Sequence, residues 1–467
     1  MTPLSLDPTR SAATAAEPPR PAAPQLPNVI LPHHDDYDAA RAAWNLAADQ
    51  RPAAVVIARD AGDVVDAVRY AAAAGHRVVP QGTGHLASAL PDMSDAVLVR
   101  TDIGGVEVDP VARRARIGAG TVWQEVVDAV TPHGLAALSG SSHDVGVLGY
   151  TLGGGMSWLA RRYGLASNHV HAIELVTADG RLIRVDADHE PELFWAVRGG
   201  GGNFGIVTTI EIELFPVTEV FGGMTVWPID DVREVLDAWT TWARTAPDAA
   251  TTSFRMLRLP PLPDVPEPLR DTPIVVIDGA VLAGSWEAAA MIDQFRSAGT
   301  PIMDTWEAMS PAGLLQIHMD PPAPVPALGD TMQIGDLDEA GIDALLEVIR
   351  PEEIAPLLMV ELRQMGGALS RKPEGAGARA NLDGAFALFA VGIPMSPEIT
   401  EQLHARLTEM LDAMRPWATG SFYVNFGERG GDMEAAFTPR TYKRLQAVRR
   451  EWDPGERFIA SHRIATS

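Results

Sequence analysis

The feature that most constrains this sequence is a set of glycine-rich loops next to predicted strands. One loop, Gln81–His85, follows the apolar run Arg77–Pro80, and a second glycine-dense segment covers Gly140–Gly155. Glycine is needed where the backbone adopts a positive φ, or where it comes close enough to a ligand for its N–H groups to contact it. The pattern therefore indicates loops that bind a ligand through backbone amides. On spacing alone, tight turns and close packing remain an alternative explanation.

Two segments match the dinucleotide-binding pattern G-x-G-x-x-G/A, and both lack its structural context. Gly82–Ala87 follows a predicted strand, but Pro91 and Asp92 interrupt the helix that a Rossmann turn should open. Gly200–Gly205 runs directly into the β-branched strand Ile206–Phe215 instead of a helix. No G-x-x-x-x-G-K-[ST] segment occurs either. We expect neither a Rossmann site nor a P-loop.

Composition excludes several classes of protein. The 467 residues, 46% hydrophobic and 21% charged, are typical of a globular chain long enough for two lobes. The formal net charge of −24 disfavours nucleic acid and anionic membranes as partners. The absence of cysteine excludes disulfides, Cys-ligated zinc, iron–sulfur clusters and thiol nucleophiles. No segment approaches ~18 uninterrupted apolar residues, so we expect no membrane span and a cytoplasmic location.

Hydrophobic patterning predicts alternating strands and helices. Asp60 and Gly75 are typical cap residues that bound a helix through Ala74. Strands are expected at 53–58, 77–80, 96–100, 113–117, 171–177, 182–185, 206–215, 274–277, 357–364 and 384–392. Further helices are expected at 122–131, 232–243, 286–298, 339–350 and 398–414.

The histidines and serines give no firm signal by themselves. His85 follows a Gly-Thr-Gly turn, and a lone loop histidine is usually a surface or packing residue. His169 and His171 enter a predicted strand without a third ligand at a recognised spacing, so no metal site is expected. Ser142 and Ser157 do not lie in a G-x-S-x-G elbow, and a hydrolase triad has no support.

Several motifs, taken in order, resemble the PCMH-type FAD-binding domain of the vanillyl-alcohol-oxidase superfamily. The sequence is most similar to its berberine-bridge-enzyme-like branch, which includes bacterial 6-hydroxynicotine-oxidase-type flavoproteins. The matching segments are P-Q-G-T-G-H at 80–85, G-S-S-H-D-V-G-V-L-G-Y-T-L-G-G-G at 140–155, W-L-A-R-R-Y-G-L-A at 158–166, E-L-F-W-A-V-R-G at 192–199, G-N-F-G-I-V-T at 202–208, Y-V-N-F at 423–426 and W-D-P at 452–454.

The resemblance implies an α+β fold: an FAD-binding domain of two α/β subdomains, and a substrate domain in which helices cover an antiparallel sheet. It divides the chain at Pro216, a boundary that the residues themselves suggest. Residues 1–30 form an Ala/Pro-rich flexible tail without signal-peptide features. We expect 31–216 to bind FAD, 217–418 to form the substrate domain, and 419–467 to return to the FAD-binding domain.

The resemblance also assigns roles around the flavin. His85 matches the histidine that bonds covalently to the flavin 8α-methyl carbon. Ser142 stands at the family's second attachment point, a cysteine, so a single link through His85 is implied. Val145 matches the position that controls oxygen access, which favours O2 as acceptor. The residues expected to contact FAD are Gln81, Gly82, Thr83, Gly84, His85, Gly140, Ser141, Ser142, Val145, Gly146, Gly149, Tyr150, Gly205, Val207, Tyr423 and Asn425.

The strand at 357–364 supplies the candidate catalytic residues of the substrate domain. With a period of two, Met359, Glu361 and Arg363 share one face, and in this family that face looks onto the flavin. A structural ion pair between Glu361 and Arg363 is an equally good reading of the strand alone. The glutamate that plant members use as base is replaced here by Arg371.

The remaining expectations concern the reaction. Tyr423 and Glu361 are the candidate bases, Arg363 would lower the pKa of a nearby acid, and Tyr150 would donate to the N1–C2=O side of the flavin. The implied activity is two-electron oxidation of a small alcohol, sugar or amine by an FAD-linked oxidase that makes H2O2. Oxidative tailoring of a secondary metabolite and non-catalytic flavin binding are the alternatives. Expected partners are the small organic substrate and O2, with the chain a monomer or homodimer.

Overall fold

A computed structural model of the chain describes residues 26, 29–259, 267, 270, 272–350 and 354–466. Most of the predicted N-terminal tail lies outside the described residues. Val29–Ile30 does not belong to a tail, because it forms strand β1 and pairs with Val55 and Val56 of strand β2. The first sheet therefore begins inside the predicted 1–30 segment.

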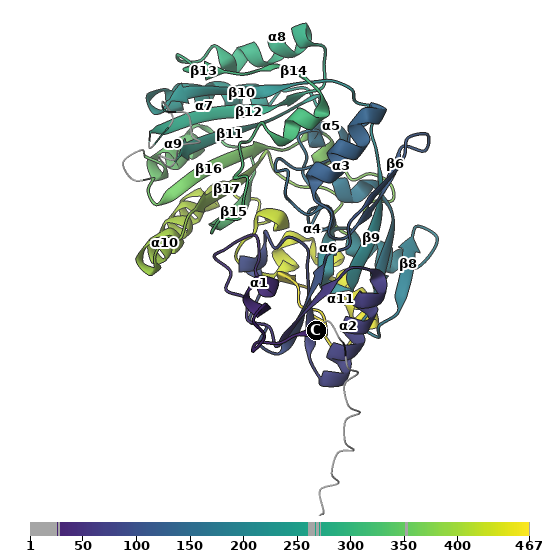
Figure 1. Cartoon of the computed structure of the whole chain (residues 1–467). Helices are drawn as coiled ribbons and strands as arrows, with labels where there is room; N and C mark the ends of the chain where they lie inside the picture. Colours follow the sequence, from purple (N-terminus) through teal and green to yellow (C-terminus); the bar gives the residue numbers. More distant parts are fainter. Residues whose placement is uncertain are drawn as a thin grey trace, which may run out of the picture.

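The first subdomain is a small sheet packed against helix α2, in purple in Figure 1. Helix α2 (Ala61–Ala74) begins where the Asp60 carboxylate accepts a hydrogen bond from the N–H of Asp63, and it ends at Gly75 with φ 75°. The predicted helix is confirmed. The sheet runs in the order β1 (Val29–Ile30), β2 (Ala54–Ala58), β4 (Ala96–Thr101), β3 (Arg77–Gln81), and α1 (Tyr37–Arg41) precedes β2.

The second subdomain contains an antiparallel sheet with helices against it. Neither G-x-G-x-x-G/A segment opens a long helix: a three-residue 3-10 turn, Ala87–Ala89, follows the first, and strand β9 follows the second. The expectation that neither segment leads into a long helix is confirmed. The sheet order is β5 (Val106–Asp109), β6 (Arg114–Gly118), β9 (Ile206–Glu213), β7 (Val170–Val176), β8 (Leu182–Asp186). The helices are α3 (Trp123–Val130), α4 (Val147–Leu152), α5 (Ala160–Tyr163) and α6 (Pro191–Gly200).

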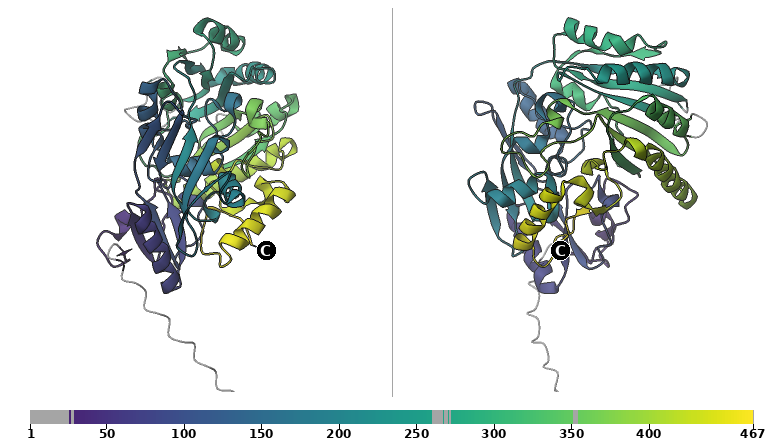
Figure 2. Two further views of the ribbon diagram at one scale, coloured as in Figure 1. Left: turned by 90° about the vertical axis from the view of Figure 1, so that its right-hand side faces the viewer. Right: turned by 180° about the vertical axis from the view of Figure 1, so that it is seen from behind.

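The substrate domain is a large antiparallel sheet with helices on one face (Figures 1 and 2). Within the described residues the order is β13 (Met303–Asp304), β10 (Val220–Pro228), β12 (Pro273–Val281), β11 (Ala250–Arg258), β16 (Leu357–Gln364), β17 (Phe386–Gly392), β15 (Leu328–Ile334), and β14 (Glu307–Met309) pairs with β10. The helices are α7 (Val232–Ala243), α8 (Ser285–Arg296), α9 (Glu339–Val348) and α10 (Pro397–Met414).

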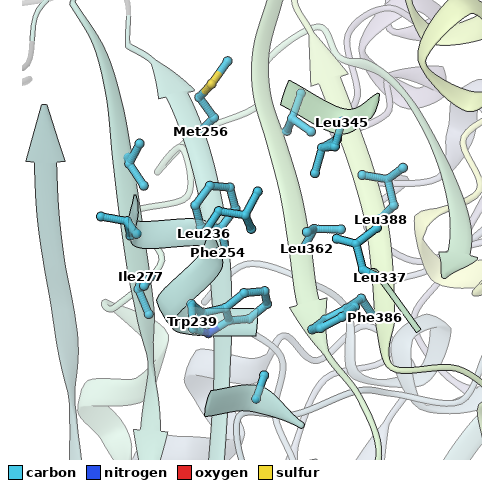
Figure 3. Packing of buried hydrophobic residues seen from close by; sticks show 14 of the residues in the cluster. Leu236, Trp239, Phe254, Met256, Ile277, Leu337, Leu345, Leu362, Phe386 and Leu388 are labelled. Carbon is cyan, nitrogen blue, oxygen red and sulfur yellow. The ribbon is translucent and has the colours of Figure 1, made fainter. Parts of the chain in front are cut away.

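The two faces of this sheet differ because side chains alternate along each strand. Phe254, Ile277 and Leu362 point toward the helices, where they pack with Trp239 of α7 (Figure 3). Each such side chain contributes about 1.5–3 kcal/mol through burial. The residues between them in the strands face the FAD-binding domain: Ser253, Arg255, Asp278, Glu361 and Arg363.

The C-terminal segment returns to the first two subdomains, as the yellow ribbon shows in Figure 2. Arg449 of α11 (Pro439–Trp452) donates to the side chain of Asn203, and the N–H of Ile459 donates to the carbonyl of Val78. Short strands β18 (Gly431–Asp432) and β19 (His462–Arg463) pair in parallel. The chain thus crosses back from the substrate domain to complete the body that it built first.

Candidate functional site

A cavity of about 860 Å³ lies between the FAD-binding and substrate domains. All residues that the sequence analysis assigned to the cofactor or the reaction line it, which places distant parts of the chain around one space. They are Gln81, Gly82, Thr83, Gly84, His85, Gly140, Ser141, Ser142, Val145, Gly146, Gly149, Tyr150, Gly205, Val207, Glu361, Arg363, Tyr423 and Asn425.

One wall, called the floor below, is the pair of loops at 81–85 and 140–146. Strand β3 ends at Gln81, and the chain then turns through Gly84 with φ 86°. A Cβ on Gly84 would lie 2.8 Å from the Cβ of Ala43, so this position requires glycine both for its conformation and for space. The carbonyl of Thr83 accepts a hydrogen bond from the N–H of Trp44 (2.9 Å), which fixes the turn.

The floor presents backbone donors without acceptors. Among the described residues, the N–H groups of Thr83, Gly84 and His85 have no acceptor, and the same holds for Ser141 and Ser142 in the second loop. Neutral amide donors from two loops suit a pyrophosphate, since they hold its charge without a cluster of basic side chains. The floor therefore fits the phosphates of a dinucleotide such as FAD.

His85 is held firmly at the end of the first loop. Its ring stacks on Trp44, with centroids 4.0 Å apart and planes at 19°. Its Nε2 lies 3.2 Å from the carbonyl oxygen of Asp144. Burial lowers the pKa of His85, although Asp144 opposes the shift. The imidazole is therefore neutral near pH 7, with Nε2–H donating to Asp144 and the Nδ1 lone pair free.

Asp144, which the sequence did not single out, connects the two loops. Its carboxylate accepts hydrogen bonds from the indole N–H of Trp44 and, at 2.8 Å, from the hydroxyl of Ser142. One carboxylate thereby positions the stacking partner of His85 and the side chain at the second attachment position. The Ser142 hydroxyl is already a donor in this network.

Two tyrosines line the cavity, Tyr150 from helix α4 and Tyr423 from the C-terminal segment. The Tyr150 hydroxyl is buried and has no partner among the described residues, so it is available to a bound ring system. Asn425 Nδ2 donates to the Tyr423 hydroxyl (3.0 Å) and to the carbonyl of Tyr150 (2.9 Å). Burial raises the pKa of both phenols above the usual range, so both are protonated donors at neutral pH.

The opposite wall, called the roof below, is a network of buried charges. Glu361 accepts a hydrogen bond from Nε of Arg363 (2.8 Å) and lies 3.4 Å from Nε2 of His318. Arg255 pairs with Asp278 and donates to the carbonyl of His318 (2.9 Å). The six members of the network are Arg255, Asp278, His318, Asp320, Glu361 and Arg363.

Each charge in the roof is fixed by its neighbours. Burial and Arg255 lower the pKa of His318, but the carboxylates of Asp320, Asp278 and Glu361 outweigh them and raise it to about 9. Burial raises the pKa of Glu361, but Arg363 and His318 outweigh it and hold it at about 2. His318 is thus an imidazolium and Glu361 a carboxylate across the working range of most enzymes.

Among the residues that the sequence analysis missed, Arg255, His318, Asp320 and Glu428 line the same cavity. His318 and Asp320 lie in the loop between Leu315 and β15, which carries no motif. Asp320 accepts a hydrogen bond from the Ser141 hydroxyl (3.0 Å), so it joins roof to floor. Paired polar residues at 318 and 320 beside a proline-rich loop are the only signal that the sequence offered.

Glu428 differs from the carboxylates of the roof. Burial raises its pKa to about 7, and its Oε2 has no partner among the described residues. Its own carbonyl accepts a hydrogen bond from the Ser88 hydroxyl (3.4 Å). Arg371, which replaces the glutamate of plant members, lies away from the cavity: its side chain is 61% exposed and pairs with Asp248.

Comparison with known proteins gives the fold and the cofactor. Residues 52–186 match the family described as FAD binding domain. The chain is 28% identical over 470 residues to (R)-6-hydroxynicotine oxidase of Paenarthrobacter nicotinovorans, covering 93% of this chain and 96% of that protein. The crystal structure of 6-hydroxy-D-nicotine oxidase from Arthrobacter nicotinovorans is similar at a TM-score of 0.79 and 26% identity, covering 94% of this chain and 98% of that chain.

A BBE-like 1 protein of Physcomitrella patens has the same fold, with a TM-score of 0.81 at 20% identity over 94% of this chain and 97% of that chain. No helix of the described residues has the length and apolar character needed to cross a bilayer. The floor offers amide donors that suit a pyrophosphate, and the matched FAD-binding domain identifies FAD as the cofactor. The chain accordingly contains an FAD-binding domain, is similar over almost its whole length to 6-hydroxynicotine oxidase, and is an FAD-dependent oxidoreductase.

Proposed function

We propose that the protein is an oxidase with a single covalent link between His85 and the 8α-methyl carbon of FAD. It would oxidise a small alcohol, sugar or amine and pass the electrons to O2, which yields H2O2. The observation that carries this proposal is the position of His85, held against Trp44 at the end of a loop whose amide donors have no acceptor among the residues that the structure describes. The relative named 6-hydroxynicotine oxidase supports an oxidase activity.

The state of His85 suits bond formation to carbon. A neutral imidazole with a free ring nitrogen is a nucleophile, and burial keeps His85 neutral while Asp144 accepts its other N–H. Ser142 offers a hydroxyl that already donates to Asp144, and the chain contains no cysteine. Both facts favour attachment of the flavin at a single residue, His85.

Bound FAD would supply a two-electron acceptor, which takes a hydride from the substrate carbon and passes the electrons to O2. The chain positions the reactants. Tyr150 and Tyr423, both protonated, offer hydrogen bonds where negative charge develops. Glu361 stays ionised, so it would orient an O–H or N–H of the substrate, with Arg363 as its fixed counter-charge.

The proton of the substrate heteroatom needs an acceptor with a pKa near the operating pH. Tyr423 and Glu361 are poor choices, because the pKa of the first is raised beyond the working range and that of the second is held at about 2. Glu428, with a pKa raised to about 7 by burial, is the cavity carboxyl that suits this step. We therefore assign Glu361 to substrate orientation and Glu428 to proton acceptance.

The test begins with the purified protein, its visible spectrum and precipitation in acid. We expect a yellow pellet, because covalent flavin stays with the denatured chain. Screening of alcohols, sugars and amines should then give H2O2 in equal amount to oxidised product. A yellow supernatant over a white pellet would remove the covalent link, and product without H2O2 would favour oxidative tailoring. Bound flavin that no substrate reduces would refute the enzyme assignment for those substrate classes.

A further inference from the structure

A second cavity of about 610 Å³ shares no lining residue with the main cavity. It lies between α6, β15, the segment at 377–383, the turn at 419–421 and the start of α11. Both domains and the C-terminal segment therefore contribute to it. None of its residues carries a role in the proposed reaction.

Two buried side chains in this cavity have donors without acceptors. Arg379 is 3% exposed, and neither its Nε nor its Nη2 has a hydrogen-bond partner among the described residues. Gln333 is 1% exposed, and its Nε2 is unpartnered in the same way. Burying a guanidinium without hydrogen-bond acceptors costs free energy. The presence of Arg379 here therefore indicates that a ligand provides the missing acceptors.

The charges around Arg379 favour an anion. Lys372, Arg440 and Arg444 also line the cavity, against Asp383 as the acidic residue. The carboxylate of Asp383 accepts a hydrogen bond from Asn381, and Arg444 is engaged by Glu192 through two hydrogen bonds. In a chain with a net charge of −24, such a concentration of cations stands out.

The first turn of α11 adds to this field. Pro439 begins a helix of 14 residues, whose N-terminus carries partial positive charge, and Thr438 and Arg440 of that turn line the cavity. The Thr438 hydroxyl caps the N–H of Thr441. Helix dipole and guanidinium therefore act on the same space.

We propose that this cavity binds a small organic oxyanion, a carboxylate or a phosphate ester, through Arg379 and Gln333. The Nε and Nη2 atoms of arginine form the edge that takes two oxygens of such a group side by side. Gln333 supplies a third donor. Phe437, whose ring lies 4.6 Å from the Arg379 guanidinium, and Trp195 provide apolar surface for the carbon part of the ligand. The volume exceeds the need of a bare ion.

Gly154 separates this site from the main cavity. A Cβ on Gly154 would be 3.3 Å from Cδ of Arg379 and 3.4 Å from Cε2 of Tyr423. The Arg379 charge thus acts on the Tyr423 phenol across a single backbone position. An anion bound to Arg379 would neutralise that charge. Ligand binding should therefore change the electrostatic field at Tyr423 in the main cavity.

The test uses the flavin-loaded holoenzyme and calorimetric titration with three probes: succinate, glycerol 3-phosphate and inorganic phosphate. We expect the wild type to bind succinate or glycerol 3-phosphate, and the preferred probe identifies carboxylate or phosphate ester. Arg379→Met should weaken that binding about tenfold or more. Gln333→Leu should weaken it by a smaller factor, and it serves as the second variant if Arg379→Met does not fold.

Arg371→Met is the matched control, since it removes the same charge from an exposed arginine that does not line the cavity. It should leave the affinity unchanged. Without ligand, Arg379→Met should melt at or above the wild-type temperature, because it removes an unpaired buried charge. The proposal is overturned if the wild type binds none of the probes, if phosphate alone binds, or if Arg371→Met weakens binding as much as Arg379→Met.

Discussion

The floor and the roof of the main cavity are built on opposite principles. The floor presents backbone N–H groups that have no acceptor within the described part of the chain, and it needs glycine to expose them. The roof uses paired charged side chains, so the pKa of His318 is raised and that of Glu361 is lowered by their neighbours. The floor therefore depends chiefly on backbone geometry, whereas the roof depends on the identity of each side chain.

The largest expected effect concerns the floor. His85→Ala should abolish covalent attachment, because His143, the other histidine of the floor, does not line the cavity. The amide donors stay in place, so FAD should still bind without a covalent bond. Acid precipitation of the yellow variant should leave a white pellet and a fluorescent supernatant. Ser142→Ala is the control and should keep the flavin in the pellet; a yellow pellet from His85→Ala would sink the assignment.

The next effect concerns the roof. Glu361→Leu would leave Arg363 and His318 as buried cations without their shared carboxylate. The free energy of unfolding of the holoenzyme should fall by about 3–5 kcal/mol, as measured by urea denaturation.

The matched control is Glu211→Leu, which breaks a surface pair with Arg184 and should cost about 1 kcal/mol or less. Equal losses in Glu361→Leu and Glu211→Leu would show that the roof is no more dependent on its charges than the protein surface is.

A smaller effect is expected from the backbone of the floor. Gly84→Ala places a side chain at φ 86° and 2.8 Å from Ala43, so it should cost about 1–3 kcal/mol and weaken FAD binding in the apoprotein. Gly104→Ala is the control, because a Cβ there meets no atom within 4 Å. Calorimetric titration of the two apoproteins with FAD compares them directly, and indistinguishable affinities would contradict the role of Gly84.

The most graded effect is the pH dependence of catalysis. A base works only when deprotonated, so below the pKa of Glu428, about 7, kcat/KM should fall about tenfold for each pH unit and should level above it. Glu428→Gln should remove this limb together with most of the activity. If kcat/KM stays level until the pH falls to about 2, Glu361 is the base. If kcat/KM is still rising above pH 10, Tyr423 is the base.

The sequence predicted the floor well because its determinants are local. The glycines of 81–85 and 140–149 are adjacent in the chain, and a loop of free amides needs only a short motif. Glu361 and Arg363 were found by strand alternation: they form the ion pair that was one reading of the strand, and they line the cavity, while their role in catalysis or binding stays a prediction. Their partner His318 could not be found, since only the folded sheet brings its loop to them.

Several elements escaped prediction for a physical reason. Strand β10 contains two glycines and a proline, and β11 has both faces buried in its centre, so neither shows an alternating pattern. Helix α11 is rich in arginine, and only Tyr442, Leu445 and Val448 are both apolar and buried in it. Glu428 lies in an irregular segment, and its pKa is raised mainly by burial and further by Asp330, which is distant in sequence.

The return of the C-terminal segment has a consequence for how the enzyme matures. Strand β3 lies at the edge of its sheet, and Val78 obtains its second partner only from Arg457 and Ile459. On a ribosome, roughly 310–370 residues separate the loops of the floor from that partner, which corresponds to about 15–75 s of synthesis. Tyr423 and Asn425 arrive in the same late stretch. Flavin capture therefore follows translation, and cells short of riboflavin should accumulate a finished chain that waits for its cofactor.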